Sequence, residues 1–142
     1  MTTVEASIEI DRPVNLVFAF LTDLENLKMQ NPGITSIKLN GLFAVGSRYI
    51  TKGEVMGREF STETEIMAIE QNKRFSIKTL APPPAPPVTN TYALEPYGSG
   101  TKLTTSMDAV IMGFGMEEMI KTQLKGALEA GNEVIKKLIE AA

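Results

Sequence analysis

The first residues of the chain alternate between apolar and polar side chains. The apolar set is Val4, Ala6, Ile8 and Ile10, and the residues between them are polar. Successive side chains of a strand point to opposite faces, so this period of two predicts a half-buried strand. The Asp11–Pro13 segment should end the strand and begin a helix, because Asp can cap a helix and Pro fits the first helical turn.

Two short helices are predicted next. The dense apolar run Val14–Leu21 indicates a short buried helix. The Thr22–Glu25 segment matches a capping box, in which a Thr cap is followed three residues later by Glu. A second short helix should start there and end at about Met29 or Gln30, because Pro32 cannot continue the helical hydrogen bonding.

A series of strand patterns follows the two helices. Gly53–Gly57 between two of them is predicted as a turn, and the proline-rich Ala81–Pro87 as a stiff loop that cannot be a central strand. Spacings of roughly 10 residues with short turns predict an antiparallel meander, which has seven strands when the first one is included. The six strand segments are Ile34–Leu39, Ser47–Lys52, Phe60–Ala68, Arg74–Leu80, Val88–Leu94 and Lys102–Ile111.

The C-terminal segment has the clearest helical pattern, with apolar residues at steps of three and four and charged residues between them. This pattern predicts a helix of about 25 residues, or about 37 Å at 1.5 Å per residue. One long apolar stripe needs a broad surface to pack on, and the predicted sheet supplies it. The stripe consists of Met116, Met119, Ile120, Leu124, Ala127, Leu128, Gly131, Val134, Ile135, Leu138 and Ile139.

The composition limits the chemistry that the chain can perform. None of the 142 residues is Cys, His or Trp. The absence of Cys and His excludes a Ser-His-Asp triad, a thiolate nucleophile and a zinc site with Cys or His ligands. We expect no cofactor, although carboxylates could still form a site for Mg²⁺ or Ca²⁺.

Charge and hydropathy limit the partners and the location. The net charge is -3 and the 14 Lys and Arg residues are scattered, so nucleic-acid binding is not expected. The N-terminal residues do not form a signal peptide, and no apolar run is long enough to span a membrane. The sequence therefore predicts a single cytoplasmic domain over residues 1–142.

The predicted order is one strand, two short helices, six strands and a long helix, and it resembles a known family. The chain looks like a member of the polyketide cyclase/dehydrase and lipid-transport superfamily (START-like, SRPBCC), which shares its helix-grip fold with the major birch pollen allergen. Many relatives have Trp before the Pro-Gly turn, where this chain has Met29, Gln30 and Asn31. The resemblance covers essentially the whole chain and rests on Ile8–Phe18, Leu21–Leu27, Asn31–Gly33, Gly46–Ser47, Gly100–Leu103 and the terminal helix.

The resemblance implies an α+β fold in which a curved, seven-stranded antiparallel sheet wraps around the C-terminal helix and leaves an apolar cavity between them. The mouth of that cavity would be formed by Met29–Gly33, Gly53–Arg58, Ala81–Val88 and Met112–Met116. Methionines gather in these segments, and Met is common on adaptable binding surfaces. Tyr92 and Gln123 could orient a ligand oxygen.

Strand parity and the methionine cluster together give a set of predicted ligand-binding residues. For each of them the alternative is an ordinary core or boundary residue. The set is Met29, Met56, Phe75, Ile77, Tyr92, Leu94, Met107, Met112, Met116, Met119, Ile120 and Gln123.

Three functions fit the sequence. The first is non-enzymatic binding or transport of a hydrophobic small molecule, either a lipid or a polyketide-like compound. The second is a cyclase or dehydratase on an aromatic or polyketide-like substrate, and the third is a protein-interaction module. The sequence favours the first, because strand parity turns the carboxylates outward. A homodimer is left open. The candidate acid, base or polarising groups for an enzyme are Glu63, Glu65, Asp108, Arg58, Tyr49 and Tyr92.

Overall fold

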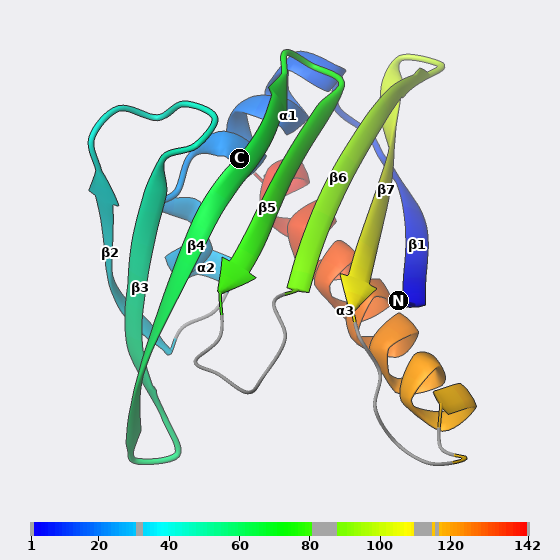
Figure 1. The fold of residues 1–142 in the computed structure, drawn as a ribbon. Helices are drawn as coiled ribbons and strands as arrows, with labels where there is room; N and C mark the ends of the chain where they lie inside the picture. The colour runs from blue at the N-terminus through cyan, green and yellow to red at the C-terminus, as the bar shows by residue number, and fades with distance from the viewer. Residues whose placement is uncertain (1, 31–32, 81–87, 110–114, 116, 142) are drawn as a thin grey trace.

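The computed structural model describes residues 2–30, 33–80, 88–109, 115 and 117–141 (Figure 1). Its elements are β1 (Thr2–Ile10), α1 (Val14–Thr22), α2 (Asn26–Gln30), β2 (Ile34–Asn40), β3 (Arg48–Val55), β4 (Arg58–Glu70), β5 (Arg74–Leu80), β6 (Val88–Tyr97), β7 (Gly100–Ala109) and α3 (Glu117–Ala141).

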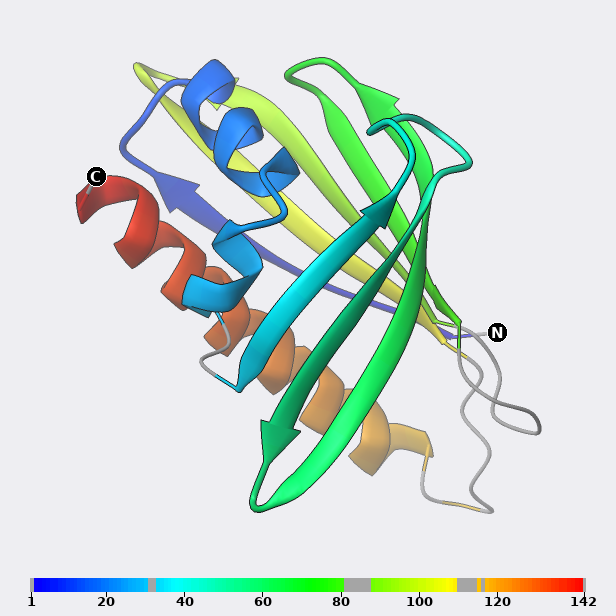
Figure 2. The same ribbon diagram turned by 90° about the vertical axis from the view of Figure 1, so that its left-hand side faces the viewer.

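All seven strands form one antiparallel sheet in the order β1-β7-β6-β5-β4-β3-β2. The sheet curves, and the three helices lie on its concave inner face (Figure 2). α3 is 25 residues long and packs on β1 and β7, while α1 packs on β5, β6 and β7. The predicted helix-grip fold is therefore confirmed.

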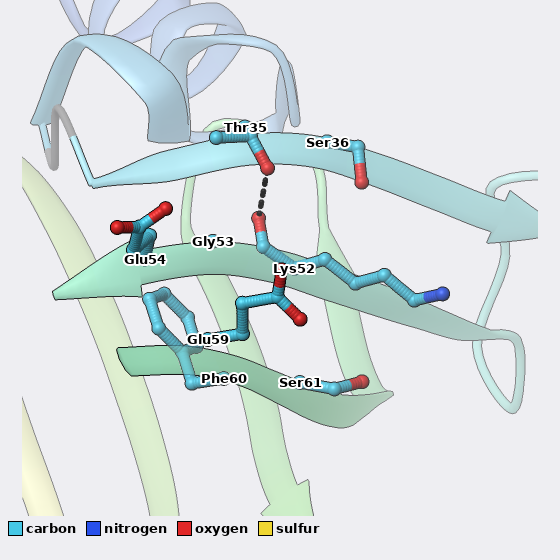
Figure 3. A pocket seen from close by; sticks show the side chains of 8 residues that line it. All are labelled: Thr35, Ser36, Lys52, Gly53, Glu54, Glu59, Phe60 and Ser61. Carbon is cyan, nitrogen blue, oxygen red and sulfur yellow. Dashed lines mark hydrogen bonds between the residues drawn. The ribbon is translucent and has the colours of Figure 1, made fainter. Parts of the chain in front are cut away.

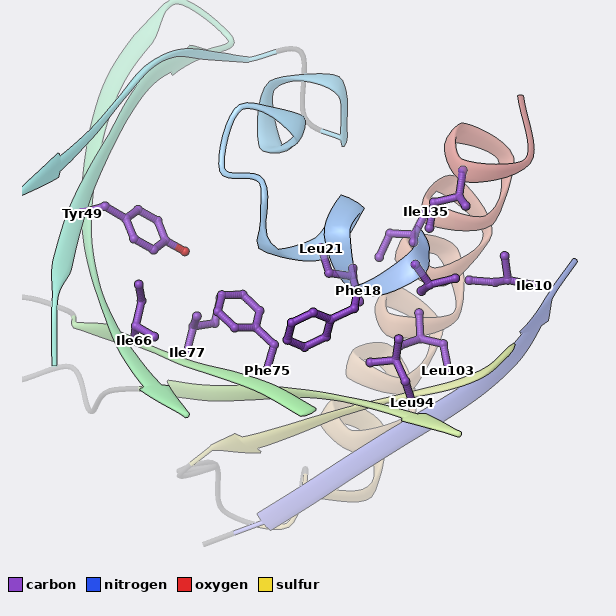
Figure 4. Packing of buried hydrophobic residues seen from close by; sticks show 12 residues of the cluster. Ile10, Phe18, Leu21, Tyr49, Ile66, Phe75, Ile77, Leu94, Leu103 and Ile135 are labelled. Carbon is purple, nitrogen blue, oxygen red and sulfur yellow. The ribbon is translucent and has the colours of Figure 1, made fainter. Parts of the chain in front are cut away.

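The main core lies between the sheet and the helices (Figure 4). Strand parity explains its composition, because every second residue of each strand points to the inner face. The buried members are Ile10, Val17, Phe18, Leu21, Tyr49, Ile66, Phe75, Ile77, Leu94, Leu103, Ile135 and Ile139. A second cluster lies beneath the middle of α3 and contains Val4, Ala6 and Leu128.

The predicted capping box was wrong. Thr22 does not start a capping box: it is the last residue of α1, and its hydroxyl donates to the Phe18 carbonyl. Asp23 instead accepts a hydrogen bond from the Glu25 backbone N–H. Such short side chains can bond to several nearby backbone groups, so the sequence did not determine which residue caps.

The predicted turn Gly53–Gly57 was too long. β3 continues through Gly53 to Val55, and the turn is made by Met56 and Gly57, both with positive φ. A side chain at Gly53 would collide with the Gly33 carbonyl oxygen and would approach the Phe60 ring to 2.7 Å. Glycine is therefore required here for close approach within the sheet rather than for a turn.

The end of α3 is fastened to the corner between β1 and α1. Asp11 does not cap α1: the N-cap position is Pro13, and no side-chain hydrogen bond caps the helix. The Asp11 backbone N–H donates to the Glu140 carboxylate at 2.8 Å. Lys136 also donates to that carboxylate, at 2.7 Å, and the Arg12 guanidinium donates to the Glu140 backbone carbonyl at 2.6 Å. The Asp11 N–H and Lys136 hold the pKa of Glu140 below its usual value.

One polar side chain anchors the middle of α3. Asn132 is only 2% exposed. It accepts a hydrogen bond from the Thr105 hydroxyl of β7 at 2.7 Å and donates one to the Ala6 carbonyl of β1 at 3.2 Å. Apolar contacts alone would let a helix slide or rotate, whereas these two bonds fix its position over both strands.

Replacing Asn132 with Ala should lower the free energy of unfolding by about 3 kcal/mol, because it leaves two buried groups without partners and opens a small cavity. Urea unfolding would measure the change. The matched control is Glu133→Ala, one residue away on the exposed face, which should change stability by less than about 0.5 kcal/mol. Equal effects of the two variants would contradict the anchoring role of Asn132.

Candidate functional site

A polar residue lies in the middle of an aliphatic row on the inner face of the sheet. Strand pairing places Ile66, Ile77, Asn90, Met107 and Val4 side by side across β4, β5, β6, β7 and β1. The Asn90 side-chain oxygen, Oδ1, is buried and has no hydrogen-bond partner within the described structure. Buried polar atoms are nearly always satisfied, so this acceptor marks a place where a donor is missing.

Two phenols lie on the same inner face. Tyr49 of β3 is 2% exposed, and burial raises its pKa to about 12. A hydrogen bond with Thr64 opposes this rise, and nearby Tyr92 of β6 adds to it. Burial also raises the pKa of Tyr92. Both phenols are therefore protonated near neutral pH and can act as hydrogen-bond donors.

Aromatic rings form a wall beside these polar groups. The Phe75 ring stacks between two others, with its centroid 5.9 Å from that of Phe43 and 6.4 Å from that of Tyr92. Register places Phe75 directly opposite Tyr92. Phe75 is only 2% exposed, so this aromatic wall is part of the packed main core and lies next to a phenol.

The strand carboxylates proposed as enzymatic groups lie on the outer face. Arg48 bonds to Glu63 at 2.9 Å and to Glu65 at 3.0 Å, and Asp108 accepts from Thr3. Arg58 has inward parity but is exposed at the start of β4. The buried part of the inner face carries hydroxyl and amide groups among apolar side chains, so the region around Asn90 is uncharged.

α3 contributes a flank that the sheet does not cover. The helix buries Leu128, Asn132, Ile135 and Ile139. Its apolar stripe is wider than this buried face: Val134 is 39% exposed, and Ala127 and Gly131 are also exposed. Part of the stripe is thus free to contact something other than β1 and β7.

The structure brings together some of the predicted site residues. Phe75, Ile77 and Tyr92 share the inner face beside Asn90, and Leu94 is buried farther along β6 in the main core. Met107 is partly buried against the second cluster.

The other predicted residues lie apart from that group. Met56 is 97% exposed at the β3–β4 turn, and Met29 of α2 is also exposed. On α3, Ile120 is half-buried, Gln123 is exposed and Met119 is 50% exposed. Met112 and Met116 lie outside the described residues.

Sequence reasoning missed the role of Asn90 and did not include Tyr49 among the lining residues. Asn90 has the same parity as Tyr92, so a search for polar residues on the inner faces of strands would have found it. Tyr49 required the pairing of β3 with β4, which sets it opposite Thr64.

A groove in the described structure lies elsewhere, across β2, β3 and β4 (Figure 3). Its volume is about 640 Å³. Register sets Glu54 opposite Glu59, and Lys52 lies on the same outward side of β3, so this groove is polar and charged. It does not suit an apolar ligand, and the inner face remains the better candidate. The lining residues are Thr35, Ser36, Lys52, Gly53, Glu54, Glu59, Phe60 and Ser61.

A family model described as "Polyketide cyclase / dehydrase and lipid transport" matches residues 1–140. The chain belongs to this family. The polyketide cyclase/dehydrase and lipid transport family suggests either hydrophobic ligand binding or cyclase or dehydrase activity. The resemblance inferred from the sequence motifs is therefore confirmed, while a search of curated proteins finds no match.

Solved structures agree with this family in their fold. Ara h 8.0201 is 16% identical with a TM-score of 0.75, and each chain is 99% covered. MLL2253 from Mesorhizobium loti is 21% identical with a TM-score of 0.76, covering 99% of this chain and 98% of that one. The di-domain ARO/CYC protein BexL from the BE-7585A biosynthetic pathway is 16% identical with a TM-score of 0.75, over 99% of this chain and 50% of that one.

Two other kinds of site were sought in the described ranges. No three Asp or Glu side chains there lie close enough together to hold a metal ion. Among the described helices, none has both the length and the apolar character needed to cross a membrane.

Stability should fall as the pH rises from about 10 to about 12. An unfolded Tyr ionises near pH 10, whereas folded Tyr49 holds its proton to about pH 12. Below pH 10 the contribution of Tyr49 to the free energy of unfolding is therefore fully present. It is lost as the pH rises through the folded pKa, and the loss from this residue amounts to about 3 kcal/mol.

Urea unfolding between pH 9 and pH 12 would measure this loss. Tyr49→Phe should reduce it, whereas Tyr97→Phe, at an exposed position, serves as the control and should leave it unchanged. A Tyr49→Phe variant with the full wild-type loss would show that Tyr49 is not the group responsible.

Proposed function

We propose that the chain binds a neutral, mostly apolar small molecule between the inner face of the sheet and α3, and that the ligand carries at least one hydrogen-bond donor. The buried, unpartnered Oδ1 of Asn90 is the observation that carries the proposal. Leaving such an acceptor unpaired costs about 1–3 kcal/mol. A ligand hydroxyl would remove that cost.

The neighbours of Asn90 define the rest of the ligand. Ile77 and Met107 lie directly beside it on the adjacent strands, and Ile66 lies one strand farther. These side chains favour an aliphatic or aromatic skeleton over a polar one. The methionine can adjust its shape to different skeletons.

The phenols add a preference for oxygen acceptors. Because the pKa values of Tyr49 and Tyr92 are raised, both hydroxyls can donate to a carbonyl or ether oxygen near neutral pH. Strand parity gives the described inner face one cation, Arg58, which is exposed at the start of β4, eight residues along the strand from Ile66. An anionic ligand beside Asn90 would therefore find no compensating cation there. Hydroxylated lipids and polyketide-like molecules combine the required features.

A cyclase or dehydratase activity is the second candidate, and the pair of protonated phenols favours it. A donor placed at a ketone oxygen stabilises the negative charge that develops when a neighbouring carbon is deprotonated. The structural likeness to the ARO/CYC protein BexL is consistent with this reading at the level of fold. The base would then be water or a group of the substrate, since the strand carboxylates lie on the outer face of the sheet.

The donor preference is tested with two probes of similar shape, 2-naphthol and 2-methylnaphthalene, and with the near-isosteric variant Asn90→Leu. In the wild type, the hydroxyl of 2-naphthol should add about 1 kcal/mol of binding free energy that it does not add in Asn90→Leu. The ratio of the 2-naphthol affinity to the 2-methylnaphthalene affinity should therefore be about five-fold higher in the wild type. The variant should bind 2-methylnaphthalene at least as well as the wild type. Fluorescence titration would give the four dissociation constants of this cycle.

The matched control for this cycle is Thr91→Val, one residue away on the outer face of β6, which should leave both affinities unchanged. If Asn90→Leu keeps the wild-type ratio of the two affinities, Asn90 does not select a donor. If neither probe binds the wild type, the proposal of an apolar ligand fails.

A further inference from the structure

A separate hollow lies between α2, the start of β2 and the middle of α3. Figure 2 shows α2 alongside α3, and the two helices are in contact. The hollow has a volume of about 380 Å³. It shares no lining residue with the inner-face row around Asn90. Its walls are Leu27 and Gln30 of α2, Ile34 of β2, and Ala130, Gly131 and Val134 of α3.

Its lining is aliphatic apart from one amide. Leu27, Ile34 and Val134 present branched side chains from three different elements. Gln30 supplies the one polar side chain of the lining, and an amide can both donate and accept a hydrogen bond. No charged side chain lines the hollow, so its walls match a neutral molecule rather than an ion.

The described residues leave this space unfilled, although Gly131 has room for a side chain. Gly131 lies in the interior of α3, where glycine weakens a helix relative to alanine. A Cβ added at Gly131 would meet no atom within 4 Å. Close packing therefore does not explain the glycine, and its absent side chain leaves the hollow open.

We propose that this hollow is a second ligand site, which takes a neutral aromatic or branched alkyl group bearing one hydroxyl or carbonyl for Gln30. Its size fits this assignment, because a cavity of about 150 Å³ accepts one benzene ring and this hollow is about 380 Å³. One or two rings, or a branched alkyl group of similar bulk, therefore fit. The site stands apart from the inner-face proposal and does not require it.

The chain offers a matched control on the same helix. Gly126 is also in α3, and a Cβ there would likewise meet no atom within 4 Å. It does not line the hollow, and the helical period places it on the side away from the buried face of α3. Substitutions at Gly126 therefore report the general effect of replacing a helical glycine.

Stability is measured first, with alanine at each glycine. Gly131→Ala and Gly126→Ala should both raise Tm, each by roughly 3 °C, since alanine favours the helix and nothing obstructs its methyl group. A lower Tm for Gly131→Ala alone would show that tight packing requires the glycine, and it would overturn the proposal of an open site.

Binding is then mapped on the full ¹⁵N-labelled chain with 2-naphthol, by following backbone amide shifts in two-dimensional NMR. Saturable shifts are expected at Leu27, Ile34, Gly131 and Val134. Gly131→Leu should weaken this binding at least ten-fold by filling the hollow, while Gly126→Leu should leave it unchanged. Val134→Thr keeps the side-chain shape and reduces its apolar surface, so it should weaken 2-naphthol binding several-fold. This variant replaces Gly131→Leu in the test if Gly131→Leu does not fold.

The same spectra separate this proposal from the inner-face proposal. Shifts confined to Asn90 and Tyr92 and their neighbours would overturn the second site and leave the inner-face site standing. Shifts confined to the residues of the hollow would support the second site and count against the first. Unchanged binding in Gly131→Leu, or no saturable shifts anywhere, would overturn the second site.

Discussion

The two hydrogen bonds made by the Asn132 side chain determine where α3 lies, and the rest of the molecule is arranged around that position. The side chain joins the helix to β1 through the Ala6 carbonyl and to β7 through the Thr105 hydroxyl. Burying an amide is favourable only when its groups are paired, so other positions of the helix on the sheet would leave these groups unsatisfied. The Glu140, Lys136 and Arg12 contacts fasten the C-terminal end of the same helix.

This anchoring has a consequence for the inner face. Because α3 packs on β1 and β7 at one side of the sheet, the inner faces of β5 and β6 are packed against α1 instead. The inner faces of β3, β5 and β6 carry the aromatic wall, the two protonated phenols and Asn90 among aliphatic side chains. Among the buried side-chain polar atoms of the described residues, Asn90 Oδ1 is the one without a hydrogen-bond partner, and a neutral ligand with a donor group would satisfy it. Family membership, which suggests hydrophobic ligand binding or cyclase or dehydrase activity, is consistent with the proposed apolar ligand.

The sequence predicted the fold well because the two faces of each element differ so clearly. The alternation of Val4, Ala6, Ile8 and Ile10 identified β1, and the three-and-four spacing of Leu124, Leu128 and Ile135 identified α3. The site was harder to predict because its contacts join distant parts of the chain. Asn132 sits on the buried side of α3, yet its partners are 27 and 126 residues away.

Parity could predict which way Asn90 faces, but the lack of a partner for its oxygen depends on every neighbouring element. For the exposed methionines, residue type was readable from the sequence but the packing surroundings were not. Met56 was predicted to line a cavity mouth from the resemblance and from its residue type, and it lies 97% exposed at the β3–β4 turn. Residue type therefore suggested which side chains could contact a ligand, whereas the fold of the backbone determined which of them share a surface.

Native mass spectrometry of the purified full chain, followed by solvent extraction, tests the central claim most directly. The account predicts a discrete, neutral, apolar compound bound in a one-to-one or two-to-one ratio, recovered in the organic phase and carrying at least one hydroxyl or amide N–H. A protein that remains bare after purification and also fails to take up 2-naphthol would contradict it.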